Sequence, residues 1–200
     1  MAHQLERIEW VQYWAEDCSV PGPRVLMIGD SISVGYRSAV FARIRERYGA
    51  ATVSTSKALD NPRFCAEIDA LASSEGFDYR VIHFNNGLHG FQLADDEYRE
   101  HYVKTADFLL ARWPDARLII AASTPVTENG KPDVLAPINE KVLARNRIAR
   151  EIADARGLEY NDLYELVVGD PSLRSPDGYH YNQAGYEKMA DKIAALFLRD

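Results

Sequence analysis

The chain has 200 residues, of which 46% are hydrophobic and 26% are charged, and it contains 12 Gly and 9 Pro. This length and composition are typical of one globular domain and exclude a disordered chain. The formal net charge of -7, with both signs interspersed along the chain, argues against a nucleic-acid partner. Two cysteines are too few for a disulfide framework, and they lack metal-ligand spacing.

The first 20 residues predict a helix that packs on the rest of the domain. Apolar residues recur there at helical spacing and stop before the "VPGP" break at 20–23. The stretch also contains acids and lacks a long apolar core, so it predicts neither a secretory signal nor a membrane span. A cytoplasmic protein without a membrane partner is therefore the expectation.

Strands and helices alternate over the rest of the chain. Apolar runs too short for helices predict strands at 25–28, near 51–56, and at 79–84, 116–123 and 158–162. Helical spacing predicts helices at about 33–49, 62–74, 95–113, 137–156 and 182–198. Because a parallel crossover needs a helix to return the chain, this alternation predicts an α/β fold with a mostly parallel sheet of about five strands and helices on both faces.

One of these strand ends combines an acid with a hydroxyl. Asp30 and Ser31 follow the run "VLMI" and Gly29, and helical spacing begins directly after them. In open sheets of this class, ligands bind at the carboxyl ends of the strands. Ser31 would therefore project into the binding crevice beside unpaired backbone N–H groups, unless it only caps the helix.

A second candidate lies before the last predicted helix, in "SPDGYHYNQAGY" at 175–186. Two residues separate Asp177 from His180, so a tight turn would let the carboxylate face one ring nitrogen of the histidine. That contact would fix the tautomer and stabilise the imidazolium that forms when the other nitrogen accepts a proton from a serine. The alternative is an ordinary surface turn, since Pro, Asp and Gly all favour turns.

Taken together, the "GDSIS" block after the first long strand and the "DGYHYNQAGY" block before the last helix resemble the SGNH, or GDSL, hydrolases. The resemblance extends from Arg24 to about Met189. It implies a three-layer α/β/α, flavodoxin-like fold, with residues 1–200 forming a single domain. It also implies a serine esterase that hydrolyses esters or thioesters, often acetyl groups on carbohydrates, without a metal or an organic cofactor.

The same resemblance assigns roles to individual residues. Ser31 occupies the place of the family's nucleophile, His180 that of its general base, and Asp177 that of the acid that orients the base. Asp30 is a supporting residue: adjacent strand residues point to opposite sides, so it is expected to accept hydrogen bonds from loop backbone and hold the nucleophile turn.

The oxyanion hole is where the sequence departs from the family pattern. Family members use the N–H of the nucleophile, here Ser31, the N–H of a glycine after the second strand, and an asparagine side chain after the third. The second block, "VSTSKALDNPRF", contains no glycine, so one of residues 56–58 would supply that N–H. The third block, "HFNNGLHG", resembles a subgroup with an Asn-x-Gly-Leu-His segment. That makes Asn85 the first choice for the side-chain donor and Asn86 the second.

Two features of the third block have alternative readings. Both asparagines could simply satisfy a turn with Gly87. His89, two residues further on, would either touch a substrate or orient the loop.

These residues predict a serine ester hydrolase that forms an acyl-enzyme on small acyl esters, acetyl esters above all, of a carbohydrate. Segment 124–141 is polar and follows a strand at the active end, so it predicts a lid or a wall that favours a polar acyl carrier. Two alternatives would use the same residues, namely a catalytically inactive carbohydrate-binding domain and an acyltransferase. The acyl and alcohol parts of the substrate and the oligomeric state stay open at this level.

Overall fold

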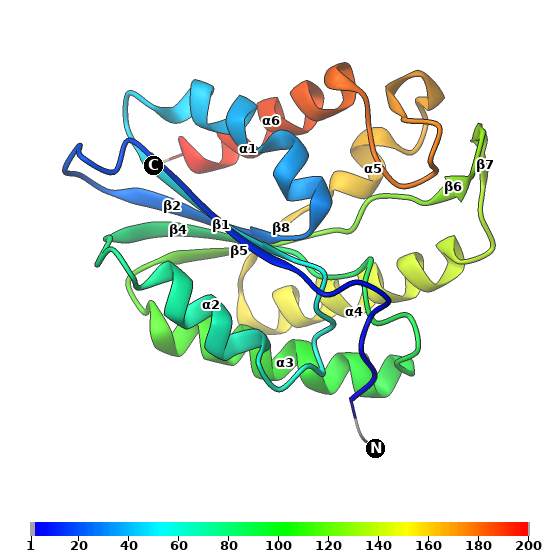
Figure 1. Cartoon of the computed structure of the whole chain (residues 1–200), viewed down its shortest axis with the longest axis horizontal. Helices are drawn as coiled ribbons and strands as arrows, with labels where there is room; N and C mark the ends of the chain where they lie inside the picture. Colours follow the sequence, from blue (N-terminus) through cyan, green and yellow to red (C-terminus); the bar gives the residue numbers. More distant parts are fainter. Residues whose placement is uncertain (1–2, 200) are drawn as a thin grey trace.

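In the computed structural model, which describes residues 3–199, a six-stranded sheet lies between two layers of helices (Figure 1). The strand order across the sheet is β1-β3-β2-β4-β5-β8. The strands are β1 (Val11–Glu16), β2 (Arg24–Gly29), β3 (Gly49–Thr55), β4 (Tyr79–Phe84), β5 (Arg117–Ala121) and β8 (Glu159–Asn161). All neighbouring pairs are parallel except β1 with β3, which is antiparallel. The predicted α/β class and the mostly parallel sheet are confirmed, with one strand more than expected.

The helices divide between the two faces of the sheet (Figure 1). One face is covered by α1 (Ser31–Ile44), α5 (Leu163–Val167) and α6 (Gln183–Phe197), and the other by α2 (Phe64–Ala72), α3 (Asp95–Arg112) and α4 (Asn139–Arg156). A short 3-10 helix, η1 (Pro171–Leu173), precedes α6, and a separate two-stranded hairpin is formed by β6 (Thr127–Glu128) and β7 (Lys131–Leu135). The layers are those that the alternation of strands and helices requires.

The central strand β2 shows why the core has two halves. Its successive side chains point to opposite faces, so Val25 and Met27 join the cluster under α1 and α6, whereas Leu26 and Ile28 join the cluster under α2, α3 and α4. All four are fully buried. A continuous apolar run is what a strand covered on both faces needs. The strand predicted at 79–84 is confirmed with the same bounds as β4.

The expected helix over the first 20 residues is wrong. Residues 11–16 form the edge strand β1, which pairs with β3, and the described residues before it form neither helix nor strand. Tyr13 and Ala15 turn toward the core at strand spacing, while Trp14 between them is 44% exposed. The helical spacing of the apolar residues was outweighed by the unpaired backbone edge of β3, which a strand satisfies and a helix does not.

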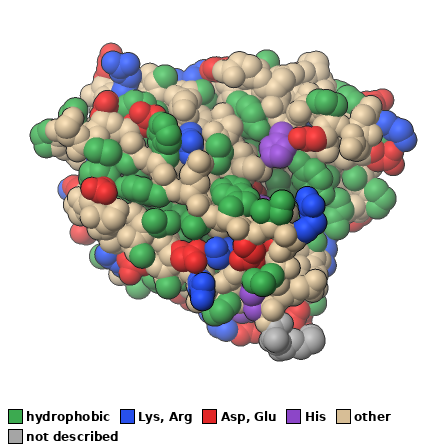
Figure 2. All heavy atoms as spheres, viewed as in Figure 1, with side chains coloured by type: hydrophobic (Ala, Val, Ile, Leu, Met, Phe, Trp, Pro, Cys, Tyr) green, Lys and Arg blue, Asp and Glu red, His purple; other side chains and the backbone are tan. Residues whose placement is uncertain are grey.

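Charges of both signs are interspersed on the face shown in Figure 2. Basic side chains lie there singly or beside acidic ones, among hydrophobic side chains. Within residues 3–199, no helix combines the length and the apolar character needed to cross a bilayer.

Strand order places the candidate site. The chain passes from β2 to β3 on one side and then returns to β4 on the other, so strand order reverses between β3 and β4. The carboxyl ends of β2 and β4 flank that reversal, which is where open sheets of this kind bind ligands. Ser31 follows β2, and Asn85 follows β4.

Candidate active site

The corner at Asp30 and Ser31 is built by the change from strand to helix. β2 ends at Gly29, Asp30 is the N-cap of α1, and Ser31 is the first helical residue. The Asp30 carboxylate accepts a hydrogen bond from the Ile32 N–H at 2.9 Å, which satisfies one of the orphan donors of the helix start. This is the contact that a supporting role for Asp30 requires. The Ser31 N–H has no intrahelical acceptor at this position.

Ser31 and the turn before α6 meet in space although 149 residues separate them. The Ser31 Oγ lies 2.8 Å from Nε2 of His180, and Nδ1 of the same ring lies 2.7 Å from Oδ2 of Asp177. Both distances are those of hydrogen bonds. The three side chains predicted to act together therefore form one continuous chain of hydrogen bonds.

The Asp177 carboxylate is held in its charged form by its own turn. Its Oδ1 accepts hydrogen bonds from the backbone N–H groups of Tyr179 at 2.9 Å and His180 at 2.8 Å. Burial by itself raises the pKa of Asp177, but these hydrogen bonds and the contact with the His180 ring outweigh it and leave the pKa below its usual value. An ionised Asp177 suits the task of orienting an imidazole that becomes charged.

The hairpin within segment 124–141 supports that turn directly. The Thr127 N–H donates to the Gly178 carbonyl at 2.8 Å, and the Gly130 N–H donates to the Pro176 carbonyl at 2.7 Å. Gly178 has a φ of +85, and a Cβ there would lie 2.3 Å from the Thr127 carbonyl oxygen. Only glycine allows this close approach, so the hairpin and the Asp177–His180 turn are locked together.

The two asparagines after β4 differ in how their amide hydrogens are used. Asn85 donates from Nδ2 to the Ala121 carbonyl at 2.8 Å and to Ser123 Oγ at 3.0 Å, which occupies both hydrogens. Asn86 donates from Nδ2 to the Lys57 carbonyl at 2.9 Å, which leaves its second hydrogen without an acceptor among the described residues. The structure brings neither side chain into a hydrogen bond with Ser31.

The backbone N–H groups of residues 56–58, which follow β3, also differ in whether they already have an acceptor. The Ser56 N–H donates to the Trp10 carbonyl at 3.2 Å, and the Lys57 N–H donates to Thr55 Oγ1 at 3.1 Å. No hydrogen bond of the described residues occupies the Ala58 N–H. Sequence reasoning left these three positions equivalent, and the internal acceptors distinguish them.

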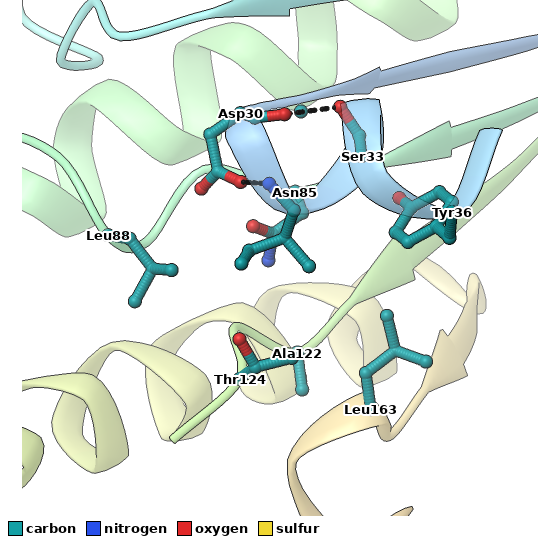
Figure 3. A pocket seen from close by; sticks show the side chains of 10 residues that line it. Asp30, Ser33, Tyr36, Asn85, Leu88, Ala122, Thr124 and Leu163 are labelled. Carbon is teal, nitrogen blue, oxygen red and sulfur yellow. Dashed lines mark hydrogen bonds between the residues drawn. The ribbon is translucent and has the colours of Figure 1, made fainter. Parts of the chain in front are cut away.

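A small pocket lies beside the corner formed by Asp30 and Ser31 (Figure 3). It collects side chains from the carboxyl ends of β2, β4 and β5 and from α1 and α5. Its lining includes Asp30, Ile32, Ser33, Tyr36, Asn85, Leu88, Thr124 and Leu163. Among residues 3–199, no group of three or more His, Cys, Asp or Glu side chains is arranged to hold a metal ion.

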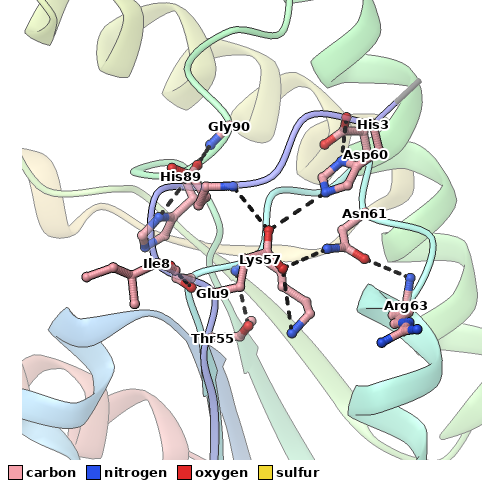
Figure 4. A network of polar contacts seen from close by, with 12 residues as sticks. His3, Ile8, Glu9, Thr55, Lys57, Asp60, Asn61, Arg63, His89 and Gly90 are labelled. Atoms are coloured by element: carbon pink, nitrogen blue, oxygen red, sulfur yellow. Dashed lines mark hydrogen bonds and ion pairs between the residues drawn. The ribbon is translucent and has the colours of Figure 1, made fainter. Parts of the chain in front are cut away.

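The segment before β1 reaches the site loops in a way that the sequence did not reveal (Figure 4). Glu6 accepts a hydrogen bond from the Gly90 N–H at 2.6 Å, and its carboxylate lies 3.8 Å from the His89 ring. Glu9 accepts from Asn61 at 3.1 Å and lies 3.8 Å from the Lys57 ammonium. His89 therefore contacts the amino-terminal segment, and no periodicity in the sequence signals these long-range contacts.

Solved structures resemble most of this chain at low sequence identity. An acetyl xylan esterase aligns with a TM-score of 0.72 and 16% identity, covering 88% of this chain and 100% of the other. A carbohydrate acetylesterase from Sinorhizobium meliloti aligns with a TM-score of 0.68 and 18% identity over 88% and 100% of the two chains. A GDSL-like lipase from Bacteroides thetaiotaomicron aligns with a TM-score of 0.67 and 16% identity over 86% of each chain. No curated protein matches the sequence.

The fold and the family assignment together define the class. The molecule is an esterase of the SGNH/GDSL type, built on a three-layer α/β/α domain. The chain belongs to the GDSL-like lipase/acylhydrolase family, whose sequence pattern matches residues 27–188.

Proposed function

We propose that this esterase hydrolyses small acyl esters, acetyl esters above all, carried by a carbohydrate, through an acyl-enzyme on Ser31. The observation that carries the proposal is the continuous chain from Ser31 Oγ through the His180 ring to Asp177, with distances of 2.8 and 2.7 Å. A nucleophile bonded to a base, which a third group orients, is the arrangement that activates a hydroxyl.

The reaction follows from the atoms of this chain. The Ser31 Oγ attacks the acyl carbonyl carbon while His180 Nε2 takes the hydroxyl proton, and Asp177 stabilises the resulting imidazolium through Nδ1. As the tetrahedral intermediate collapses, His180 returns the proton to the leaving alcohol oxygen and the acyl group stays on Ser31. A water then attacks the acyl carbon while His180 takes its proton. As the bond between the acyl carbon and Ser31 Oγ breaks, His180 gives this proton to Oγ, which releases the carboxylic acid and restores the Ser31 hydroxyl.

Three donors are assigned to the oxyanion. The first is the N–H of Ser31, the first residue of α1. The second is the Ala58 N–H, which has no internal acceptor among the described residues. For the side-chain donor, the uncommitted hydrogen favours Asn86 over Asn85, which reverses the order that the motif alone suggested. Donors that are fixed in place before the reaction stabilise developing charge without reorganising.

The acyl and alcohol parts are supported by different observations. The pocket beside the corner is small, and its lining includes the apolar side chains of Leu88 and Leu163, which favours a short acyl chain over a long one. The hairpin that contacts the His180 turn carries an exposed ion pair between Glu128 and Lys131 at 2.6 Å, which suits a hydroxyl-rich carrier. Structurally similar proteins include an acetyl xylan esterase and a carbohydrate acetylesterase.

Substrate choice is tested with a panel of p-nitrophenyl esters from acetyl to octanoyl and with acetylated xylooligosaccharides. We expect kcat/KM to be highest for acetyl and to fall as the chain lengthens, with acetate released from the sugar esters. Ser31→Ala measured in parallel gives the rate that does not depend on the site. A preference for octanoyl, or no release of acetate from any sugar ester, would contradict the proposal.

Two alternatives share the residues and need separate measurements. A fluorophosphonate probe should label wild-type protein at Ser31 and leave Ser31→Ala unlabelled, whereas a carbohydrate-binding domain without catalysis would not label. Product analysis with a sugar acceptor in excess distinguishes hydrolysis from acyl transfer. We expect free acetate in both the presence and the absence of the acceptor.

A further inference from the structure

Arg145 is a buried arginine bound to backbone carbonyls of the loop after β4. It lies on α4 with no exposed surface, and its guanidinium donates to the carbonyls of Gly87 at 3.0 Å, His89 at 2.6 Å and Gly90. The same group lies over the rings of Phe91 and Tyr98, 4.8 and 4.5 Å from their centroids. Neutral carbonyls and aromatic faces thus surround a cation.

Such an arrangement needs a reason, because a buried cation is costly unless it is fully hydrogen-bonded. Burial lowers the pKa of Arg145, although an arginine stays protonated at neutral pH. Three carbonyls that converge on one planar group are held in a fixed geometry, which a flexible ammonium would not reproduce. The residue therefore fixes the shape of loop 87–90.

That loop is tied to the proposed oxyanion donors at two points. Tyr98, which lies against Arg145, donates its hydroxyl hydrogen to the Asn86 carbonyl. Gly90 has a φ of +67 and approaches Ala58 so closely that a Cβ would lie 2.5 Å from the Ala58 Cβ. A shift of loop 87–90 would therefore move Asn86 along the chain and Ala58 by contact.

The opposite side of the loop is held by the amino-terminal segment (Figure 4). Glu6 accepts from the Gly90 N–H at 2.6 Å, while Arg145 binds the Gly90 carbonyl. The peptide groups on both sides of Gly90 are thus fixed from two directions. Asn86, which directly precedes this loop, is itself buried.

We propose that Arg145 is a positioning residue for ester hydrolysis, which acts by fixing loop 87–90 and through it the Asn86 and Ala58 donors. The inference rests on the proposed function, because those donors matter only if an oxyanion forms at Ser31. Arg145 itself touches no reacting atom in this scheme. Its loss should therefore lower the rate of the chemical step and leave substrate binding little changed.

The chain offers a matched control at the other end of the sheet. Arg24 is also buried, and it donates to the carbonyls of Glu16 at 2.6 Å, Asp17 at 2.6 Å and Val20 at 3.2 Å. Its guanidinium lies 3.9 Å from the centroid of Phe77. The two arginines share burial, carbonyl partners and an aromatic face, but the Arg24 turn carries none of the proposed site residues.

The experiment compares Arg145→Lys with Arg24→Lys, and adds Tyr98→Phe as a variant that removes only one hydroxyl. Steady-state kinetics with p-nitrophenyl acetate are measured at a temperature where each variant is folded by circular dichroism. We expect kcat of Arg145→Lys to fall about 10- to 100-fold with KM within about twofold of wild type. Tyr98→Phe should show a smaller loss of the same kind, and Arg24→Lys should keep the wild-type kcat.

Two results would overturn the positioning role of Arg145. One is a wild-type kcat in folded Arg145→Lys, and the other is an equal loss of kcat in Arg24→Lys. If Arg145→Lys does not fold, Tyr98→Phe decides by the same criterion.

Hydrogen exchange of the amides at 86–91 separates this proposal from the proposed function. Exchange there should be faster in Arg145→Lys, or in Tyr98→Phe if the lysine variant does not fold, and unchanged in Arg24→Lys. An unchanged rate would overturn the fixing of the loop. Wild-type protein without any Ser31-dependent turnover would instead overturn the proposed function, whatever the exchange result.

Discussion

At each end of the mostly parallel sheet, a buried arginine binds the backbone carbonyls of a loop. At the amino end, Arg24 binds the carbonyls of a turn at 16–20, and at the carboxyl end Arg145 binds the carbonyls of loop 87–90. The turn at the amino end connects β1 to β2, whereas the carboxyl end gathers Ser31, Asn86 and the Asp177–His180 turn. The contacts of Arg24 therefore stabilise a connecting turn only. The equivalent contacts of Arg145 hold a loop that bears on the proposed chemistry.

The largest expected effect is confined to the carboxyl end. Ser31→Ala removes the proposed nucleophile, and we expect kcat/KM for p-nitrophenyl acetate to fall by at least about 10⁴-fold. Because Ser31 is a partly exposed first residue of α1 and Ala has a high helix propensity, the unfolding midpoint in urea should stay close to that of wild type. A purified variant with wild-type turnover would show that Ser31 is not the nucleophile.

A smaller effect distinguishes the two asparagines after β4. Asn86→Ala should lower kcat by about 10² to 10³, which is typical for the loss of one oxyanion donor. Asn85→Ala loses its contacts with Ala121 and Ser123, so it should cost stability more than rate. Kinetics and urea unfolding of both variants check this, and the reverse pattern would restore Asn85 as the donor.

A third prediction concerns His83, which lies between the two ends on β4. Burial lowers its pKa to about 3, whereas an unfolded histidine has a pKa near 6.5. Below pH 6.5 the unfolded chain binds a proton that the native protein does not, so the free energy of unfolding falls as pH falls from about 6.5 toward 3.

At pH 4.5 this contribution amounts to about 2 to 3 kcal/mol. Urea unfolding at pH 7.5 and 4.5 should show that His83→Gln loses less stability than wild type between the two values. The same loss in both proteins would mean that another group controls the acid sensitivity.

The smallest effects come from a pair of glycines that contact the two ends. A Cβ on Gly87 would lie 1.9 Å from Ser123 Oγ, and a Cβ on Gly49 would lie 2.4 Å from Nη1 of Arg24. Either substitution by Ala should cost about 1 to 3 kcal/mol in unfolding free energy. Only Gly87→Ala should also lower kcat, by about tenfold, since the loop it moves bears the proposed donor. Equal kinetics in the two variants would remove the distinction between the ends.

Local patterns predicted the layers of this molecule and which candidate catalytic side chains lie close together. The short apolar run at 79–84, which contains Val and Ile, predicts a strand, and the structure confirms it. Ser31, Asp177 and His180 were identified from two short blocks, and the structure brings them within hydrogen-bond distance. Both results depend on residues that are close together in the sequence or on a recognisable motif.

Contacts between distant segments were beyond such patterns. The apolar residues of the first 20 positions fit a helix as well as a strand, and the free edge of β3 decided the outcome. Arg145 lies 58 residues from Gly87 within the helix predicted at 137–156, and no local pattern there indicates a contact with the loop after β4. The choice between Asn85 and Asn86 depends on which acceptors surround each amide, and neighbours in sequence do not reveal them.

The hairpin of β6 and β7 links two properties that are often separable in enzymes. Its backbone bonds to Gly178 and Pro176 hold the turn that presents His180, and the same hairpin carries the exposed ion pair of Glu128 and Lys131 that we relate to a polar carrier. An insertion or exchange in this hairpin would therefore change turnover together with preference for the alcohol. Changes that keep the backbone bonds of Thr127 and Gly130 would leave the turn that presents His180 in place.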